Sequence, residues 1–348
     1  MAKRERVLIT GGAGFIGSHL AELLLPEHPV VVIDNFSTGS TRLEGVEYVE
    51  ADISTDDGHE ITAEVLKNVT QVYHLAAGVG VRYTLEHPEA VFKTNLHGAH
   101  WILTACAERK LPLLFTSSSA VYGRIEHAMA SEEDDVRYGH PQTPEWLYSF
   151  EKALVEGIVG IMGRAGSAFK IVRIFNCIGT RQVSDYGMVV PTFVRAALRG
   201  EPVKVYGTGG QERTFSDVRD VVVGMKLVMD KGEAGKAYNL GGKSTVSMTE
   251  LARRVIQLTD SRSSIVFVPY SEAFRPEFDE TQRRCPNLRR IQNLGYKPHY
   301  KLDETLKWII DDERKKLAAN PEHEIDWAHV RSGDSPVAAA PTVGQAQG

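Results

Sequence analysis

Residues 7–17 read VLITGGAGFIG, an apolar run followed by three glycines spaced three apart, Gly11, Gly14 and Gly17. The continuous run at 7–9 predicts a strand buried on both faces, and residues 18–24 have the composition of a helix. Glycines at a strand-to-helix turn let the backbone turn sharply and let a phosphate approach the main chain, with the helix amino terminus facing it. The pattern predicts a diphosphate-binding turn near the start of the chain.

The next apolar run, residues 30–33, ends in an acidic residue, Asp34. In a dinucleotide-binding unit, a carboxylate at this place accepts hydrogen bonds from the adenosine ribose hydroxyls. A 2′-phosphate on that ribose would meet the negative charge, and the first arginine after Asp34 is Arg42. Asp34 therefore favours NAD over NADP as the cofactor.

Further apolar runs alternate with segments of helical character, and each ends in a small or polar residue. Residues 46–49 lead to Asp52, and residues 72–75 lead to a run of small residues at 76–78. This alternation predicts an α/β fold with a doubly wound parallel sheet. We expect Asp52 to reach the adenine amino group and residues 76–78 to leave room for the second ribose. His74 is predicted to be a satisfied strand-end histidine rather than a catalyst.

The composition excludes several classes of protein. The 348 residues are 42% hydrophobic and 24% charged, with a net charge of −5, so the chain has no basic field that would attract nucleic acid. Three cysteines without Cys-x-x-Cys spacing argue against a disulfide framework and a metal site. The first apolar stretch is too brief for a signal peptide or a membrane span. We expect a cytoplasmic protein with no nucleic-acid or membrane partner.

A second motif lies well downstream, where Tyr148 precedes Lys152 by four residues. On a helix this spacing puts the phenol and the ammonium on one face, about one turn apart. A free tyrosine titrates near pH ~10 and is a poor base at neutral pH unless a cation and a bound nicotinamide stabilise its phenolate. A strand at 113–115 ends in hydroxyl residues at 116–119, and ligands bind at such strand ends. We expect this hydroxyl cluster to face Tyr148 and Lys152 over the cofactor.

Four segments together resemble the extended short-chain dehydrogenase/reductase family, and within it the nucleotide-sugar epimerases, dehydratases and decarboxylases. They are residues 10–20 (TGGAGFIGSHL), 74–77 (HLAA), 117–123 (SSSAVYG) and 148–152 (YSFEK). The resemblance covers roughly residues 5–312.

The resemblance implies a two-part organisation. A Rossmann-type NAD-binding domain would span 1–176, with a return segment at about 216–229, and a smaller α/β nucleotide-sugar-binding lobe would span 177–312. Helices near 88–109 and 145–162 would pair in a homodimer as a four-helix bundle. The tail at 328–348 holds few large apolar residues, so we expect it to be disordered.

The cofactor contacts implied by the resemblance follow the glycine turn, the ends of the next strands and the catalytic pair. They are Gly11, Gly14, Phe15, Ile16, Gly17, Asp34, Asn35, Ser37, Thr38, Gly39, Asp52, Ile53, Leu75, Ala76, Ala77, Asn95, Ser117, Tyr148 and Lys152.

The second half of the chain supplies the substrate contacts. Asn176 matches a family asparagine that touches the substrate diphosphate, and Arg213 matches an arginine whose planar fork clamps phosphate oxygens. Arg82 would pair with a uronate, bind a cofactor phosphate or face solvent. The full implied set is Arg82, Ser118, Ser119, Tyr148, Asn176, Val190, Phe193, Tyr206, Arg213 and Arg275, with Val190 and Phe193 lining the nucleotide base.

The shared first step of these enzymes is oxidation of the sugar at C4, with Tyr148 as base and Ser118 hydrogen-bonded to the same oxygen. Family dehydratases carry an Asp-Glu pair at the next two positions, and decarboxylases a glutamate at the second, where this chain has Ser119 and Ala120. Each missing acid or base is worth about 10²- to 10⁴-fold, which disfavours dehydration.

We therefore predict an NAD-dependent UDP-sugar 4-epimerase of the UDP-glucose/galactose or UDP-glucuronate type. The alternative is a UDP-glucuronate decarboxylase or another 4-keto-forming enzyme, because loss of CO₂ from a β-keto acid needs little help. A non-enzymatic NAD-binding scaffold would not require the catalytic pair, which this chain retains.

Overall fold

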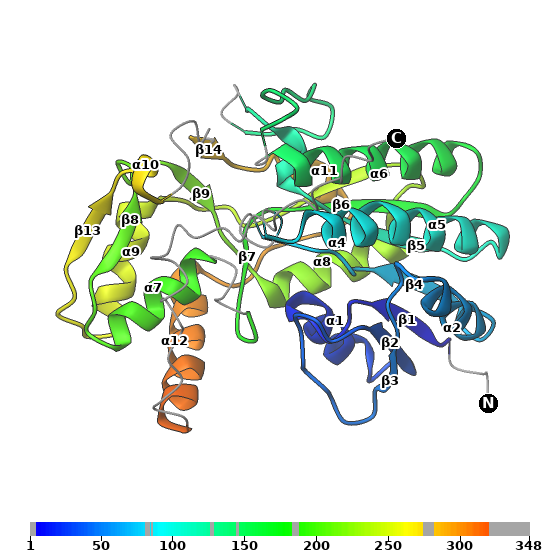
Figure 1. Ribbon diagram of the computed structural model, residues 1–348, viewed down its shortest axis with the longest axis horizontal. Coiled ribbons are helices and arrows are strands. Elements are labelled where there is room, and N and C mark those ends of the chain that lie inside the picture. The colour runs from blue at the N-terminus through cyan, green and yellow to red at the C-terminus, as the bar shows by residue number, and fades with distance from the viewer. Residues whose placement is uncertain are drawn as a thin grey trace, which may run out of the picture.

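The described residues form a seven-stranded sheet with helices on both faces, and a smaller lobe lies beside it (Figure 1). The computed structural model describes residues 5–80, 84, 86–125, 129–143, 146–182, 188–273 and 282–319. The strands are β1 (Val7–Thr10), β2 (Val30–Asp34), β3 (Glu47–Glu50), β4 (Gln71–His74), β5 (Leu113–Ser118), β6 (Phe169–Ile174), β7 (Cys177–Ile178), β8 (Val203–Tyr206), β9 (Glu212–Thr214), β10 (Ser216–Asp217), β11 (Ala237–Leu240), β12 (Thr245–Ser247), β13 (Ile265–Val268) and β14 (Arg283–Arg284).

The helices follow the predicted alternation with the strands. They are α1 (Phe15–Leu24), α2 (Asp56–Leu66), α4 (Pro88–Phe92), the π-helix η1 (Lys93–Gly98), α5 (Ala99–Glu108), the 3₁₀-helix η2 (Ser119–Tyr122), α6 (Leu147–Arg164), α7 (Val189–Leu198), α8 (Val218–Lys231), α9 (Met248–Leu258), α10 (Tyr270–Ala273), α11 (Arg289–Asn293) and α12 (Leu302–Ala319).

The large sheet has the strand order β11-β6-β5-β4-β1-β2-β3, and its neighbouring strands are parallel. The chain starts in the interior at β1, runs through β2 to the edge at β3, and then returns to the other side of β1 through β4. The strand order therefore reverses between β1 and β4, and open α/β sheets bind ligands at the carboxyl ends of the strands beside such a reversal. The predicted doubly wound fold is confirmed.

Alternating side chains of each strand bury against helices on opposite faces of the sheet. On β1, Val7 and Ile9 pack with α1 and α8, whereas Leu8 packs on the other face with α2, α5 and α6. Since both faces are covered, an inner strand must be apolar at every position. This accounts for the continuous run at the start of the chain.

The smaller lobe has its own core, built from α7, α9 and α12 against short strands. Strand β8 pairs with β13 in parallel, and β9 lies between β12 and β14. Figure 1 shows this lobe at the side of the large sheet, with α7 and α12 next to each other.

The return into the large unit is longer than the segment predicted at 216–229. Helix α8 packs against α1, and β11 then joins the large sheet beside β6, with Ala237 opposite Ile171. Parallel neighbours need a crossover connection, and α8 supplies it. Strand β11 therefore belongs to the large sheet and not to the lobe.

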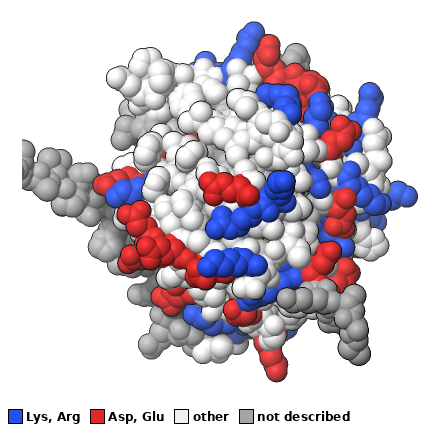
Figure 2. Space-filling view, turned by 90° about the vertical axis from the view of Figure 1, so that its right-hand side faces the viewer, with Lys and Arg blue, Asp and Glu red and all other residues white. Residues whose placement is uncertain are grey.

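On the face drawn in Figure 2, lysine and arginine side chains lie among aspartate and glutamate side chains, so this face is not a basic surface. In the described part of the chain, no helix is long and apolar enough to cross a membrane, and no group of histidine, cysteine, aspartate and glutamate could hold a metal ion. The predictions for Arg82, Arg275 and the tail at 328–348 fall outside the described residues.

Candidate active site

The glycine turn between β1 and α1 is closely packed. Gly11 has a φ of +72°, and a Cβ atom added there would lie 2.6 Å from the backbone nitrogen of Ala76. A Cβ atom on Gly17 would lie 2.3 Å from the carbonyl oxygen of Gly11. Only glycine fits either position. The turn thus brings bare main chain and the amino terminus of α1, which begins at Phe15, to the switch point of the sheet.

Asp34 fastens the end of β2 to the glycine turn. Its carboxylate accepts hydrogen bonds from the backbone nitrogens of Ala13 (2.9 Å) and Phe36 (2.8 Å). Burial raises the pKa of Asp34. Each carboxylate oxygen has two acceptor sites, so the group retains capacity for the ribose hydroxyls that we assigned to it. Gly39 packs against Ala13 as well, since an added Cβ atom would lie 2.5 Å from the Ala13 carbonyl oxygen.

The residues predicted around the adenosine lie together after β2 and β3. Asn35 donates a hydrogen bond to Asp52 (2.9 Å) and accepts one from the Ser37 hydroxyl (2.7 Å). Burial raises the pKa of Asp52, but hydrogen bonds from Ser54 and Asn35 outweigh it and lower the pKa below its usual value. Asp52 is therefore a carboxylate at neutral pH and can accept from an amino group.

The end of β4 forms another side of the predicted cofactor site. His74 forms a buried 2.7 Å hydrogen bond with the Thr10 hydroxyl, and burial, together with the charge of Lys152, lowers the pKa of His74 to about 3. The imidazole is thus neutral and structural, as predicted. Beyond it, Gly78 exchanges two hydrogen bonds with the side-chain amide of Asn95 on η1, at 2.9 and 3.1 Å.

The catalytic pair predicted from the sequence lies on α6, whose apolar side packs on the large sheet. Lys152 is only 4% exposed, and its Nζ donates a hydrogen bond to the carbonyl oxygen of Thr116 (3.1 Å) and lies 5.9 Å from the centre of the Tyr148 ring. The side chain of Ser118 lies close enough to Tyr148 to lower the pKa of its phenol, against the effect of burial. The structure brings Ser118, Tyr148 and Lys152 together at the carboxyl end of β5.

Burial moves the two titrating groups of this trio toward their neutral forms. It raises the pKa of Tyr148 to about 12, against the opposing hydrogen bond from Ser118, and lowers the pKa of Lys152 to about 8. Perturbed groups that meet at a ligand-binding edge of a sheet are typical of active sites. In the protein alone, the phenol is protonated at neutral pH and requires further positive charge to become a base.

The serines beside Ser118 have other surroundings. Ser117 points to the opposite face of β5 and donates a 2.7 Å hydrogen bond to Glu156, which also binds the guanidinium of Arg173 at 2.8 Å. Its hydroxyl is therefore engaged in the core, which leaves only its backbone for the predicted cofactor contact. Ser119 is 3% exposed at the start of η2, where Ser118 accepts a hydrogen bond from the backbone nitrogen of Ala120.

A second arginine, which the sequence did not reveal, lies beside the arginine that we predicted to clamp the phosphate. Strand β14 pairs with β9 so that Arg284 lies opposite Arg213. Arg213 is 9% exposed, and burial and the charge of Arg284 lower the pKa of Arg213 to about 10. Two neighbouring buried cations favour an anion between them. Asn176 lies close by, since its amide donates a hydrogen bond to the carbonyl of Thr214 (2.9 Å).

Two residues predicted to line the nucleotide base are buried in the lobe. Val190 and Phe193 are 1% and 4% exposed and belong to the core of the lobe. The reason is the apolar stripe of α7, which packs against α9 and α12. Their side chains therefore present almost no surface to a base. Tyr206, at the end of β8, remains 38% exposed.

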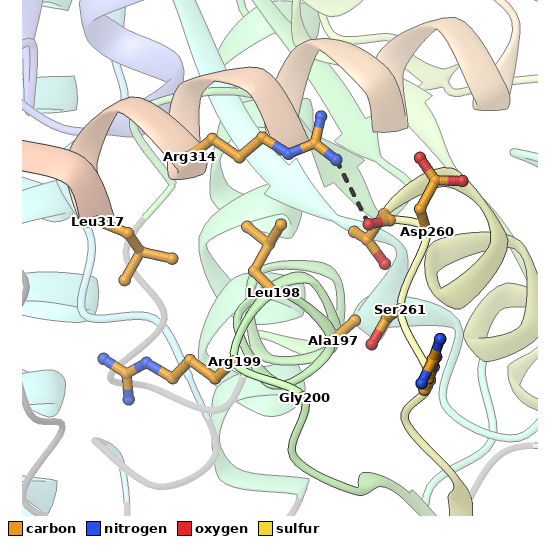
Figure 3. Close-up of a pocket in the computed structure, with 10 residues that line it drawn as sticks. Ala197, Leu198, Arg199, Gly200, Asp260, Ser261, Arg314 and Leu317 are labelled. Atoms are coloured by element: carbon orange, nitrogen blue, oxygen red, sulfur yellow. Dashed lines mark hydrogen bonds between the residues drawn. The ribbon is translucent and has the colours of Figure 1, made fainter.

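The cleft drawn in Figure 3 is not this site. It has a volume of about 560 Å³ and lies in the lobe, where α12 passes the carboxyl ends of α7 and α9. Arg314, Arg199 and Asp260 line it, and Arg314 donates a hydrogen bond to the carbonyl oxygen of Thr259. None of its lining residues belongs to the predicted site.

Comparison with known proteins agrees with this geometry. The sequence model of the "NAD dependent epimerase/dehydratase family" matches residues 7–241. The chain belongs to this family. A relative, UDP-N-acetyl-alpha-D-glucosaminuronate decarboxylase of Bacillus cytotoxicus, is 35% identical over 322 residues, which cover 89% of this chain and 99% of that protein. UDP-glucuronic acid decarboxylase 1 of Xenopus tropicalis is 35% identical over 94% of this chain and 75% of its own length.

Solved structures of the family have the same fold. The UDP-glucose 4-epimerase of Thermus thermophilus, in complex with NAD, is 29% identical, with a TM-score of 0.78 over 89% of this chain and 99% of that chain. NAD is therefore the cofactor of this family member. The residues present fit it, since the glycines of the turn leave its main chain bare at the amino terminus of α1, where a diphosphate would bind, and Asp34 offers acceptors to a ribose.

Proposed function

We propose that the protein is an NAD-dependent decarboxylase of a UDP-glycuronate, a UDP-sugar that carries a carboxylate at C6. The observation that carries this choice is the 35% identity to two decarboxylases of such substrates, in one case along 99% of the relative. We therefore favour decarboxylation over the 4-epimerase activity predicted from the sequence. The trio Ser118, Tyr148 and Lys152 supports the oxidation at C4 with which both reactions begin.

In the first step, the phenolate of Tyr148 takes the proton of the C4 hydroxyl while Ser118 donates a hydrogen bond to the same oxygen. Lys152 stabilises the phenolate through its charge. NAD, held by the Gly11 turn and Asp34, would supply the hydride acceptor for the oxidation and the hydride donor for the final reduction. The protein must therefore hold the C4 oxygen within reach of both Ser118 and Tyr148, whose side chains lie close to each other.

In the second step, the C5–C6 bond of the 4-keto acid breaks and CO₂ leaves. The electron pair of that bond moves toward the C4 carbonyl, whose oxygen carries the developing negative charge. Ser118 and the now protonated Tyr148 are placed to donate hydrogen bonds to this oxygen, which is the electrostatic stabilisation that such a step needs. C5 then takes up a proton.

A second candidate, a UDP-glycuronate 4-epimerase, is favoured by one feature, the small side chains after Ser118. Decarboxylases that this chain resembles carry a glutamate at the position of Ala120. In this chain, Ala120 follows Ser119 on η2. Without that acid, the 4-keto sugar has room to turn and take the hydride on its other face.

At the other end of the substrate, Arg213, Arg284 and Asn176 would hold the diphosphate.

We also propose a homodimer through α5 and α6. On α6, Leu154 and Ile161 are 57% and 61% exposed and seven residues apart, so they lie on one face of the helix. Glutamate at both positions should make the protein monomeric in light scattering, whereas the Val223→Glu variant, which changes an exposed valine on α8, should leave the dimer intact.

The test is incubation of the purified protein with UDP-glucuronate, UDP-N-acetylglucosaminuronate and UDP-glucose, each followed by proton NMR. We expect a UDP-pentose or its acetamido counterpart, with one CO₂ released for each turnover and no net NADH. A stereoisomer of a uronate without CO₂ would establish the epimerase instead. No product from any of the three, with NAD bound, would overturn both candidates. Tyr148→Phe is the control that should abolish turnover.

A further inference from the structure

Glu151 lies inside the catalytic pair and has no role in the steps above. It precedes Lys152 on α6 and follows Tyr148 by three residues, a spacing that puts it on the same side of the helix as the phenol. Its side chain is 2% exposed. A buried carboxylate is costly unless it is hydrogen-bonded or paired, so its partners indicate what it does.

One partner of Glu151 fixes it to the cofactor side of the sheet. The amide of Asn95, itself 2% exposed, donates a 2.9 Å hydrogen bond to Oε2 of Glu151, and the same amide exchanges two hydrogen bonds with Gly78. Glu151 is thus tied through η1 to the segment that follows β4. Its second oxygen, Oε1, is fully buried and has no hydrogen-bond partner among the described residues.

The charged neighbours of Glu151 explain why the carboxylate is tolerated. Burial raises the pKa of Glu151, whereas the hydrogen bond from Asn95 and the charge of Lys152 act in the other direction and favour the carboxylate. Tyr148 lies within range of its charge. From the sheet, His74 faces Lys152 and is neutral. An ionised Glu151 raises the pKa of Lys152, against the lowering by burial, and raises the pKa of Tyr148 further.

We propose that Glu151 is a positioning residue for catalysis, whose carboxylate keeps the buried Lys152 in its charged form and sets the pH window in which Lys152 and Tyr148 work together. Without this carboxylate, a cation that is 4% exposed would lose its proton at lower pH and could no longer support the phenolate. The inference rests on the proposed function only for oxidation at C4, the step that decarboxylation and epimerisation share.

The test compares Glu151→Gln with the wild-type holoenzyme. Glutamine keeps the shape of the side chain and can accept the hydrogen bond from Asn95, but it carries no charge. Removing a nearby negative charge should lower the pKa of both neighbours, by about one unit or more. We therefore expect both limbs of the pH profile of kcat/KM to move to lower pH by that amount, with little change in thermal stability. Glu151→Asp, which keeps the charge, should retain the wild-type limbs at a reduced rate.

A second measurement does not depend on turnover. With ¹³Cζ-labelled tyrosine in the NAD-bound protein, the signal of Tyr148, assigned through Tyr148→Phe, reports its titration directly. In Glu151→Gln the midpoint should fall by about one unit or more. An unchanged midpoint would show that Glu151 is only a structural link and would overturn the proposal, whether or not a substrate has been found. Failure of all three UDP-sugars with a shifted midpoint would instead count against the proposed function alone.

Discussion

The ammonium group of Lys152 donates a 3.1 Å hydrogen bond to the backbone carbonyl of Thr116, the residue two positions before Ser118 on β5. This bond ties helix α6, which carries Tyr148, to the strand that carries Ser118. The cation is therefore positioned by the sheet as well as by the helical spacing to Tyr148. The strand and the helix together set the distance between the cation and the phenol ring, 5.9 Å from Nζ to the ring centre.

Replacing Lys152 with methionine should lower kcat by about 10²- to 10⁴-fold, because it removes the charge that supports the base and keeps the apolar stem. Lys152→Arg should not restore activity, since a planar guanidinium differs in shape and the position is buried. Turnover can be followed by NMR, with circular dichroism as the check on folding. A methionine variant that keeps more than a tenth of wild-type turnover would contradict the role of the cation.

The glycine turn offers a matched pair of substitutions. Gly11 and Gly200 have nearly the same positive φ, +72° and +71°, but a Cβ atom on Gly11 meets backbone at 2.6 Å, whereas a Cβ atom on Gly200 has nothing within 4 Å. Gly200→Ala should cost only the strain of the left-handed backbone, about 1 kcal/mol. Gly11→Ala should cost more and abolish NAD binding in calorimetry. Equal losses of stability, with NAD binding retained in both, would mean that the turn does not hold the cofactor.

The parts of the molecule that the sequence predicted well depend on local patterns. The strand, turn and helix around Gly11, the acidic end of β2 and the pair Tyr148 and Lys152 each lie within a few consecutive turns or strand positions. The rule that ligands bind at strand carboxyl ends then places Ser118 with them. Neither step requires knowledge of contacts between distant segments.

The parts that the sequence did not reveal depend on pairings across long separations. Arg284 reaches Arg213 only through the register of β14 on β9, which joins residues about 70 positions apart. Val190 and Phe193 resemble a ligand-lining stretch, but the apolar stripe of α7 is needed for the lobe core. The alternation of β5 turns the Ser117 hydroxyl toward Glu156, so that three similar serines have three different surroundings.

His74 should make the stability of the protein depend on pH. Burial first, and then Lys152, lower the pKa of His74 from 6.5 to about 3 in the folded protein. Between pH 6.5 and 3, His74 is therefore protonated in the unfolded chain but not in the folded protein. The free energy of unfolding is highest above pH 6.5 and decreases as the pH falls from 6.5 toward 3. At pH 5.5 this group should cost about 1 kcal/mol.

Urea unfolding at pH 7.5 and 5.5 measures this loss. His74→Gln cannot take up the proton, so its free energy of unfolding should fall by about 1 kcal/mol less than that of the wild type between the two values. If the two proteins lose the same stability, His74 does not remain neutral in the folded protein.

The two arginines of the proposed phosphate clamp should affect ligand binding more than stability. Arg213 and Arg284 are buried neighbours of like charge, and this repulsion, after burial, lowers the pKa of Arg213 to about 10. A diphosphate would relieve the repulsion by accepting hydrogen bonds from both.

Arg284→Met should therefore weaken UDP binding by about 10- to 100-fold, since charge-assisted hydrogen bonds are worth about 1.5–3 kcal/mol. The free energy of unfolding without nucleotide should change little, because the loss of the like-charge repulsion offsets the loss of the contacts that Arg284 makes. Arg253→Met, at an exposed position of α9, is the control that should change neither quantity. Calorimetric titration with UDP and urea unfolding give the two numbers, and a variant that loses stability but binds UDP as the wild type does would show that Arg284 supports the lobe and not the ligand.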